Sequence, residues 1–298
     1  MRSDFAITPR QLVLLVLVTL IWGLNWPVMK IGVTGFPPLA FRTLSMWLGL
    51  PVLWIATRAL HVDLRIERRH WPELAMLTLT NMLVWHVLAV VAVQSLSSGR
   101  AAILGYTMPI WSALWGLALY GQRIRMRQVF GIAAAGLGVT LLLWHEFGQL
   151  AGRPWAAFGM LVAAAMWALG TQQLRHTRID APTLAIVFWM TAATTVAMTV
   201  LTVAFEQPRW HAPATATWWA IVSNAVLIFG FAQAAWLVLA RGLPPVASTM
   251  SVMLIPVLGT LSGAWWLKEV LHWQDGAAIA LLLVAIAATM GPRRLQPA

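Results

Sequence analysis

Five aromatic side chains lie deep within apolar stretches of the sequence, at spacings that would let them bind a small molecule. Trp22 and Trp26 stand one helical turn apart, and Trp85, Tyr106 and Trp167 each occupy the interior of a separate stretch. Aromatic walls stack on flat apolar rings and attract ammonium groups at about 0.5–2 kcal/mol. The set predicts an aromatic-lined cavity, and the alternative is that each ring only packs between helices or against its apolar surroundings.

Few polar side chains share these stretches. Asn25 lies on the same side as the first tryptophan pair, His86 lies near the middle of its stretch, and Gln233 lies in a later one. An apolar site favours the neutral imidazole, so His86 is expected to exchange one hydrogen bond, either with a substrate or with a neighbouring helix. Asn25 and Gln233 are likewise expected to form a hydrogen bond either with a substrate or with a neighbouring helix. Lys30 and Arg42 either reach toward the nearest polar surface or, for Lys30, receive a substrate carboxylate.

The residue patterns of enzymes are missing from this sequence. Its nine acidic residues all fall in loops or at the ends of predicted helices. It contains no H-E-x-x-H, no G-x-S-x-G and no Gly-rich phosphate loop. It has no cysteine, which excludes disulfides, thiolate metal sites and cysteine nucleophiles. We therefore predict no catalytic residue, no metal site, no cofactor and no enzymatic activity.

Membrane-spanning helices are the elements expected to position these side chains. Hydrophobic residues make up 60% of the chain and charged residues only 10%, whereas soluble domains carry about 25% charged residues. A span needs about 20 apolar residues, so this length supplies about ten spans. The predicted fold class is an all-α polytopic membrane protein in a lipid bilayer, with helices at about 11–32, 38–57, 72–96, 101–120, 129–144, 154–174, 181–204, 218–240, 245–266 and 275–290.

The positive charges predict the orientation of these helices. The net charge of +11 comes from single or short groups of basic residues between apolar stretches, so we expect no nucleic-acid partner. With the N-terminus in the cytoplasm, fourteen of the 20 Lys and Arg residues fall on the cytoplasmic side. Only Arg100, Arg153, Arg209 and Lys268 fall on the opposite side. The bias predicts a multi-pass protein of the cell inner membrane with both termini in the cytoplasm.

The two halves of the chain repeat one another. Residues 1–147 and 148–298 each contain five predicted helices, and an odd number makes the second half enter the membrane from the opposite side. Pro109 and Pro256 interrupt equivalent helices and are predicted hinges, since proline removes a helical hydrogen bond. The other aligned pairs are Trp22 with Trp167, Tyr106 with Met253, Gly116 with Gly263, and Gln122 with Glu269.

These motifs carry a family resemblance over essentially the whole chain. Trp22-Gly23-Leu24-Asn25 with Lys30, and the two P-x(6)-G-x(5)-[QE] blocks, resemble the EamA branch of the drug/metabolite transporter superfamily. The tryptophan load looks most like YddG-type aromatic amino acid exporters. Gln122 departs from the family pattern, which has Glu at this position, while Glu269 keeps the acid. The resemblance implies ten spans around a central cavity and transport of small metabolites.

The sequence thus predicts a carrier that exports aromatic or other neutral amino acids by alternating access. The predicted substrate-binding residues are Trp22, Asn25, Trp26, Lys30, Trp85, His86, Tyr106, Trp167, Gln233 and Met253. Since no carboxylate is embedded at mid-membrane depth, we expect facilitated diffusion without ion coupling. A monomer is one candidate for the oligomeric state in which the protein transports. The alternatives are a multidrug or organic-cation exporter with the same aromatic walls, and a polytopic lipid-processing enzyme.

Overall fold

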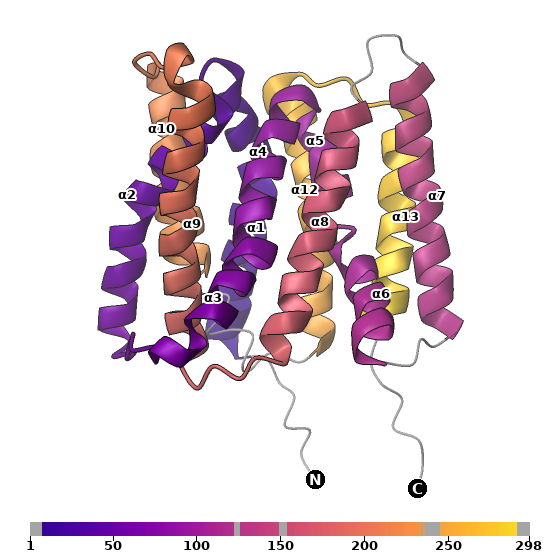
Figure 1. Cartoon of the computed structure of the whole chain (residues 1–298). Coiled ribbons are helices and arrows are strands. Elements are labelled where there is room, and N and C mark those ends of the chain that lie inside the picture. The colour runs from indigo at the N-terminus through magenta and orange to yellow at the C-terminus, as the bar shows by residue number, and fades with distance from the viewer. Residues whose placement is uncertain (1–7, 122–125, 149–153, 234, 236–244, 291–298) are drawn as a thin grey trace, which may run out of the picture.

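The computed structural model describes residues 8–121, 126–148, 154–233, 235 and 245–290, with side chains for all of these except 143, 145–148, 245–253, 289 and 290. Within these ranges the chain forms helices and no strand. Long helices stand side by side and cross the full height of the molecule (Figure 1). The all-helical class predicted from the sequence is therefore confirmed.

The helices begin where the sequence offers N-terminal signals. The helix at Pro9–Thr34 starts with a capping box. The Thr8 side chain accepts a hydrogen bond from the Gln11 backbone N–H, and the Gln11 side chain accepts one from the Thr8 backbone N–H. Four long helices have proline as their first residue, a position where the missing N–H costs nothing. The bounds are α1 (Pro9–Thr34), α2 (Pro38–Ala59), α3 (Trp71–Leu77), α4 (Val84–Ser95), α5 (Ser98–Gly105), α6 (Met108–Tyr120), α7 (Met126–Gly148), α8 (Pro154–Arg175), α9 (Thr183–Glu206), α10 (Thr215–Ser223), α12 (Pro245–Leu267) and α13 (Trp273–Met290).

Short helical segments of other types join some of these helices. Two are π-helical, namely η2 (Thr78–Leu83) between α3 and α4, and η4 (Asn224–Ala232) after α10. Two are 3-10 turns, η1 (Arg68–His70) and η3 (Gln207–Arg209). The π segments continue their helices without a break, so α3–η2–α4 and α10–η4 each form one rod.

Seven continuous helical segments in the described part of the chain are long and apolar enough to cross a membrane. They are Pro9–Thr34, Pro38–Ala59, Arg68–Ser95, Ser98–Tyr120, Pro154–Arg175, Thr183–Arg209 and Thr215–Ala232. Three shorter apolar helical segments are Met126–Leu142, Leu254–Leu267 and Trp273–Ala288. The protein is therefore a multi-pass membrane protein.

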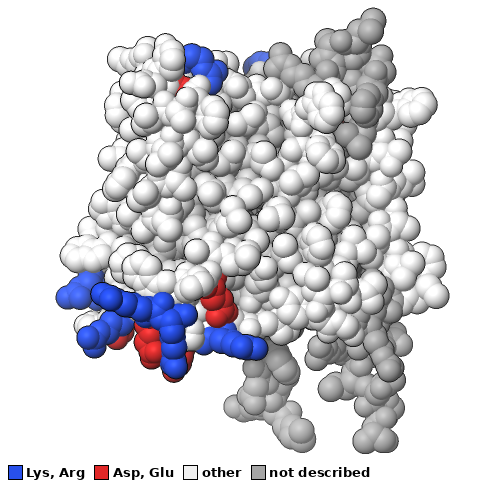
Figure 2. All heavy atoms as spheres, in the orientation of Figure 1, with Lys and Arg blue, Asp and Glu red and all other residues white. Residues whose placement is uncertain are grey.

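The two ends of the bundle differ in charge. Basic side chains gather at the lower end in Figure 2, where α2 ends and α3 begins, and few appear at the upper end. We call the end that holds Arg58, Arg65, Arg68 and Arg69 the basic end, and the opposite end, which holds Arg100 and Arg209, the distal end. The wide band between them is almost free of charged atoms in this view.

Helices from the two halves of the chain pack directly on one another. α1 lies against α12, α4 against α8, α2 against η4 and α9, and α7 against α13. Glycines permit the closest approaches. A Cβ atom at Gly23 would stand 2.6 Å from the Leu258 Cβ, and one at Gly170 would stand 2.5 Å from the Asn81 Cβ. Small residues at such contacts are typical of membrane helices, because backbones can then approach closely.

The predicted proline hinges lie in different settings. The helix that contains Pro109 breaks at Tyr106 and Thr107, so Pro109 occupies the first turn of α6 rather than a helix interior. Pro256 lies inside α12, which stays helical on both sides of it. The two positions that the sequence aligns therefore differ in backbone structure, since only the first half interrupts its helix there.

Candidate functional site

An aromatic cluster forms where four helices meet. The Trp85 and Trp167 rings lie 5.4 Å apart between centroids, and the Trp26 and Tyr106 rings lie 6.5 Å apart in an edge arrangement. These side chains come from α4, α8, α1 and the residue that ends α5. Aromatic pairs at such separations and tilts interact favourably. The structure thus brings together four aromatic residues that the sequence had singled out.

Gly105 joins the two pairs into one cluster. A Cβ atom at this position would stand 3.1 Å from Trp26 and 3.2 Å from Trp85, so both indole rings close over the glycine. Trp26 is buried, whereas Trp85, Tyr106 and Trp167 are half-buried. The cluster also lies beside the break in the helix at Tyr106 and Thr107. The two ring pairs therefore meet at Gly105, and aromatic rings of this kind are able to stack on flat apolar ligands.

The other predicted site residues lie around or away from this cluster. Trp22 is half-buried, and it packs on the main core and on a small cluster that contains Leu15 and Val18. Asn25 is half-buried on α1, and Gln233 is half-buried at the end of η4. Met253 belongs to α12, but its side chain lies outside the described residues.

Lys30 binds the end of a helix. Its ammonium group donates to the carbonyl oxygens of Val93, Gln94 and Leu96, at 3.0, 3.0 and 2.8 Å. These oxygens end α4, where the helix leaves carbonyl groups without intrahelical partners and carries partial negative charge. Lys30 therefore ties α1 to α4 at a point nearer the distal end than the aromatic cluster, and the role of substrate partner stays a prediction.

Arg42 is buried instead of reaching toward the membrane surface. Its side chain is on α2, and the residue is only 3% exposed. Nη1 donates to Asn224 Oδ1 at 3.2 Å and Nη2 to Met29 Sδ at 2.6 Å. The guanidinium also lies over the Phe229 ring, 5.7 Å from its centroid. The sequence missed this residue because a lone arginine near a helix end is usually one that extends to the interface.

His86 lies beside the same ring. Its imidazole is 5.5 Å from the Phe229 ring, and the residue is 7% exposed. Within the described part of the chain, His86 Nδ1 and Arg42 Nε are both buried without a hydrogen-bond partner. The expected bond from His86 to a neighbouring helix is therefore not made through Nδ1.

Asn81 makes hydrogen bonds between helices. Its amide group donates to the Trp167 carbonyl oxygen at 3.0 Å and to the Thr171 hydroxyl at 3.1 Å. It stands in η2, against Gly170 of α8. These bonds fix α8 next to the π segment and thereby help to place Trp167.

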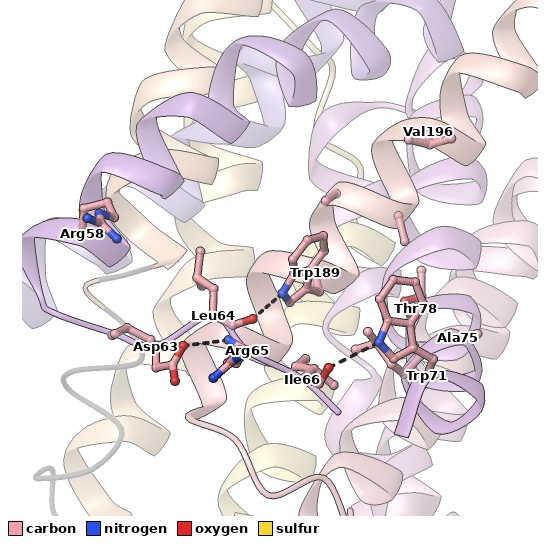
Figure 3. Close-up of a pocket in the computed structure, with 14 residues that line it drawn as sticks. Arg58, Asp63, Leu64, Arg65, Ile66, Trp71, Ala75, Thr78, Trp189 and Val196 are labelled. Atoms are coloured by element: carbon pink, nitrogen blue, oxygen red, sulfur yellow. Dashed lines mark hydrogen bonds between the residues drawn. The ribbon is translucent and has the colours of Figure 1, made fainter. Parts of the chain in front are cut away.

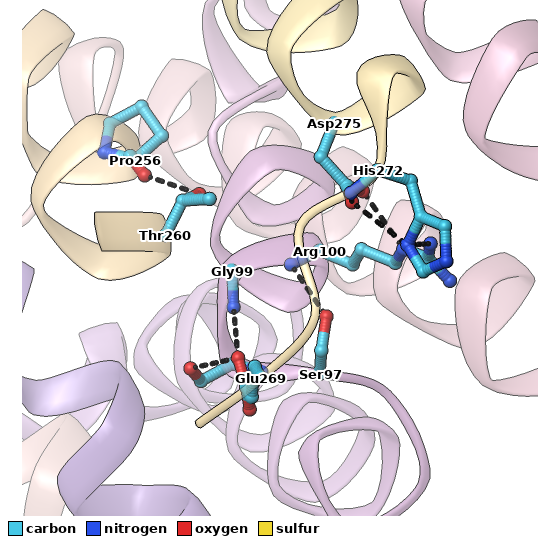
Figure 4. Close-up of polar contacts among 9 residues, drawn as sticks. Ser97, Gly99, Arg100, Pro256, Thr260, Glu269, His272 and Asp275 are labelled. Carbon is cyan, nitrogen blue, oxygen red and sulfur yellow. Dashed lines mark hydrogen bonds and ion pairs between the residues drawn. The ribbon is translucent and has the colours of Figure 1, made fainter. Parts of the chain in front are cut away.

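Buried carboxylates bind helix N-termini at the distal end. Glu269 accepts from the Ser98 amide and hydroxyl, both at 2.8 Å, and from the Gly99 amide at 3.4 Å, so it caps α5 (Figure 4). Glu206 likewise accepts from the Leu39 and Ala40 amides at the start of α2. The sequence placed these acids at helix ends correctly, but it gave no signal for their partners.

An ion pair adjoins the Glu269 contact. Arg100 Nε donates to Asp275 Oδ1 at 2.9 Å, and Arg100 Nη2 lies 3.3 Å from His272 Nδ1 (Figure 4). Asp275 is 3% exposed, and it also accepts from the His272 amide at 2.9 Å. Together with Glu269, these residues tie α5 to the segment between α12 and α13. We call this set the distal latch.

Two hollows open at the basic end. The larger, of about 690 Å³, lies between the end of α2, the following loop, α3 and α9 (Figure 3). Its rim carries Arg58 and Arg65, and the Trp189 indole donates to the Leu64 carbonyl oxygen at 2.7 Å. None of the clustered aromatic residues lines it. The smaller, of about 350 Å³, lies between α3, α6 and α8, and its lining includes Gln173, which accepts from Thr80 of η2.

Groups of three or more histidine and acidic residues close enough to hold a metal ion are absent from the described residues. Among the described acids, Glu206 and Glu269 cap helix starts and Asp275 pairs with Arg100.

The family model of the EamA-like transporter family matches residues 10–144 and again residues 154–291. Because the two matches cover most of the sequence, the chain belongs to the EamA-like transporter family. The family resemblance expected from the tryptophan motif and the two proline blocks is thereby confirmed.

Relatives along nearly the full length are named as transporters. The chain is 26% identical over 265 residues to the uncharacterized transporter YoaV of Bacillus subtilis, covering 86% of this chain and 87% of that protein. It is 26% identical over 280 residues to the uncharacterized inner membrane transporter YedA of Escherichia coli, covering 94% and 90%. It is 25% identical over 287 residues to a probable terminal-alkyne amino-acid exporter of Streptantibioticus cattleyicolor, covering 94% of each.

A solved crystal structure shares the fold. It superposes with a TM-score of 0.69 at 20% identity and covers 96% of this chain and 99% of its own. The arrangement of helices described above is therefore one that has been observed in another protein.

Proposed function

We propose that this protein is a secondary transporter that exports small metabolites, with aromatic or other neutral amino acids as its cargo. The observation that carries the proposal is the aromatic cluster of Trp26, Trp85, Tyr106 and Trp167, which brings together one ring each from α1, α4, α8 and the end of α5. Stacking on such rings holds a flat apolar side chain. The relative named a probable amino-acid exporter supports the same cargo class.

The proposed architecture is ten helices in two inverted five-helix repeats, residues 1–147 and 148–298. One observation supports the repeat independently of the prolines. η2 and η4 are both π-helical, and they fall in the third and eighth helices, which an inverted repeat makes equivalent. Inverted repeats with a site between halves are typical of secondary transporters.

Alternating access is the proposed mechanism. The distal latch ties α5 to the segment after α12, while the smaller hollow opens between α3, α6 and α8 at the basic end. This combination supports a conformation whose site faces the basic end. Pro109 and Pro256 are the proposed hinges. If the basic end is cytoplasmic, as the charge bias indicates, this conformation would receive cargo from the cytoplasm.

The proposed location is the cell inner membrane, with both termini in the cytoplasm and one chain sufficient for transport. No coupled ion is proposed. The named relative in Escherichia coli is an inner membrane transporter, which supports the location. The proposed site residues around the cluster are Trp22, Asn25, Lys30, His86, Gln233 and Met253.

A second candidate is export of organic cations, since aromatic walls also attract ammonium groups. The buried guanidinium of Arg42 argues against it, since it contacts Met29, one helical turn after Trp26, and would repel a second cation nearby. A lipid-processing enzyme is less consistent with relatives that are named as transporters.

Flux into liposomes tests the proposal. Purified protein in liposomes should carry radiolabelled tryptophan or phenylalanine down its gradient, and it should do so faster than a permanently charged organic cation. Protein-free liposomes and an aliphatic dicarboxylate serve as controls. Flux of the cation alone would support the second candidate, and no flux of either would contradict the assignment of an amino acid exporter.

A further inference from the structure

Arg42 is a buried cation without a carboxylate partner among the described residues. Burying an unpaired charge is costly, so such residues usually have a partner or mark a ligand site. Glu206, at the end of α9, caps the start of the helix that carries Arg42. Its oxygens accept the Leu39 and Ala40 amides, and its ion pair is with Arg209 at 3.3 Å. The charge on Arg42 is thus left to the neutral amide of Asn224 and the sulfur of Met29.

One edge of the guanidinium is poorly satisfied. Nε has no partner in the described structure, and Nη2 meets only a thioether, which is a weak acceptor. These two nitrogens form the side edge of the guanidinium, and their hydrogens point the same way. Two parallel N–H donors on one edge match the two oxygens of a carboxylate, which arginine binds in a bidentate manner.

Two contacts connect Arg42 to residues that neighbour the aromatic cluster in the sequence. Met29, its contact on α1, follows Trp26 by three residues, which is a rise of about 4.5 Å along the helix. His86, which shares the Phe229 ring with Arg42, directly follows Trp85. His86 Nδ1, buried and unpartnered, adds a polar atom beside the same place.

We propose that Arg42 receives the carboxylate of the cargo and thereby selects substrates that carry one, with His86 beside it. The inference rests on the proposed function, and it deepens that function by naming a specificity-determining residue. Lys30 already binds the carbonyl groups at the end of α4. In this proposal Lys30 therefore has a structural role, and Arg42 has the binding role.

The experiment compares two ligands that differ only in the carboxylate. Binding of L-tryptophan and of L-tryptophanamide to the full chain in nanodiscs is measured for the parent, for Arg42→Gln and for Arg58→Gln. Arg58 lies on the same helix at the basic end and serves as the matched control. A charged hydrogen-bonded contact gives the parent a preference for tryptophan of about 10- to 100-fold. Arg42→Gln should bring that preference close to one, and Arg58→Gln should leave it unchanged.

The pattern distinguishes binding from packing. If Arg42 only held α2 against its neighbours, Arg42→Gln would weaken both ligands alike and leave the preference intact, and that result overturns the assignment. Arg42→Lys keeps the charge and serves if the glutamine variant does not fold. It should reduce the preference severalfold, because an ammonium lacks the bidentate edge, and an unreduced preference would overturn the assignment as well. If the parent binds neither ligand, the proposed function fails and the carboxylate site fails with it. A preference that persists in both variants overturns the carboxylate site alone.

Discussion

Trp26, Met29 and Lys30 share little more than one turn of α1, yet each side chain serves a different neighbour. Trp26 closes over Gly105, Met29 contacts the Arg42 guanidinium, and Lys30 binds the end of α4. The type of each residue was visible in the sequence. Which neighbour it would meet depended on the helices packed around α1, and only the fold supplies these.

The tryptophan cluster leads to a direct prediction at this scale. Trp167→Ala should lower the apparent affinity for an aromatic amino acid about three- to tenfold, since one stacking contact is worth about 0.5–1.5 kcal/mol beyond its area. Flux into liposomes measures the effect, with membrane expression compared in parallel. Trp155→Ala is the matched control, because Trp155 lies on the same helix but is 83% exposed. Equal losses in both variants would contradict a binding role for the cluster.

The sequence anticipated the aromatic residues better than the charged ones. Large rings placed in the middle of apolar spans have few destinations besides the interior, so Trp26, Trp85 and Trp167 could be selected from position alone. Lys30 and Arg42 look alike in the sequence, as single cations near a helix end. Their contacts differ because Lys30 lies beside the carbonyl groups that end α4, whereas Arg42 lies beside the Phe229 ring.

At the scale of elements, the hydropathy pattern predicted most described helix bounds to within a few residues, but not the break at Tyr106 and Thr107. The end of the predicted 218–240 helix lies outside the described residues. The π segments could not be predicted, since no residue type marks them and α-helical and π-helical turns have similar hydrophobicity. Caps that come from distant residues were equally invisible. Glu269 binds the start of α5 across more than 160 residues of sequence, and no local pattern links them.

The close contact between α8 and η2 should depend on the absence of a side chain at Gly170. Gly170→Ala would place a Cβ 2.5–2.6 Å from the Asn81 backbone and Cβ, so the helices would have to separate. Overpacking of this kind costs about 1–3 kcal/mol. The melting temperature in detergent should therefore fall by several degrees. Gly159→Ala on the same helix meets nothing within 4 Å and should leave the melting temperature nearly unchanged; similar shifts in both would speak against the tight contact.

The distal latch should set the balance between conformations. Glu269→Gln removes the charge that caps α5, and a charge-assisted hydrogen bond is worth about 1.5–3 kcal/mol. The population open at the distal end should therefore rise about tenfold or more.

A cysteine reporter measures this shift, because the natural chain has no cysteine. Ala102→Cys places a thiol on the buried face of α5, against Gly259. Its labelling by a membrane-impermeant maleimide from the distal side should accelerate in the Glu269→Gln background. Labelling at the parent rate would show that the latch does not control access.

At the scale of the whole molecule, the charge difference between its ends predicts its orientation. Reporter fusions after Arg69 and after Gly148 should report opposite compartments, with the former in the cytoplasm. A periplasmic phosphatase and a cytoplasmic fluorescent protein at each position give complementary readings. Matching compartments at both positions would break the proposed topology.

The energetics of transport belong to the same scale. The described acids lie in loops or at helix ends, and His86 is a buried histidine beside the proposed site. Proton-coupled carriers usually relay protons through embedded acids or histidine, so we expect net flux to follow the substrate gradient alone. Liposomes with equal substrate on both sides should show no accumulation when a proton gradient is imposed. Accumulation that vanished in His86→Ala would assign the coupling to that histidine.

The π segments in the third and eighth helices change how residues along these rods must be counted. A helix repeats every 3.6 residues, but a π turn holds an additional residue within its hydrogen-bonded ring. Faces before and after each segment are therefore rotated by about 100° relative to an uninterrupted α-helix. A helical wheel drawn from Trp71 through Trp85 would assign the latter to the wrong face. In related chains, a one-residue deletion inside Thr78–Leu83 or Asn224–Ala232 would restore regular winding while leaving both flanking helices in register. Single-residue gaps in these two places are thus the length variation that this architecture can absorb.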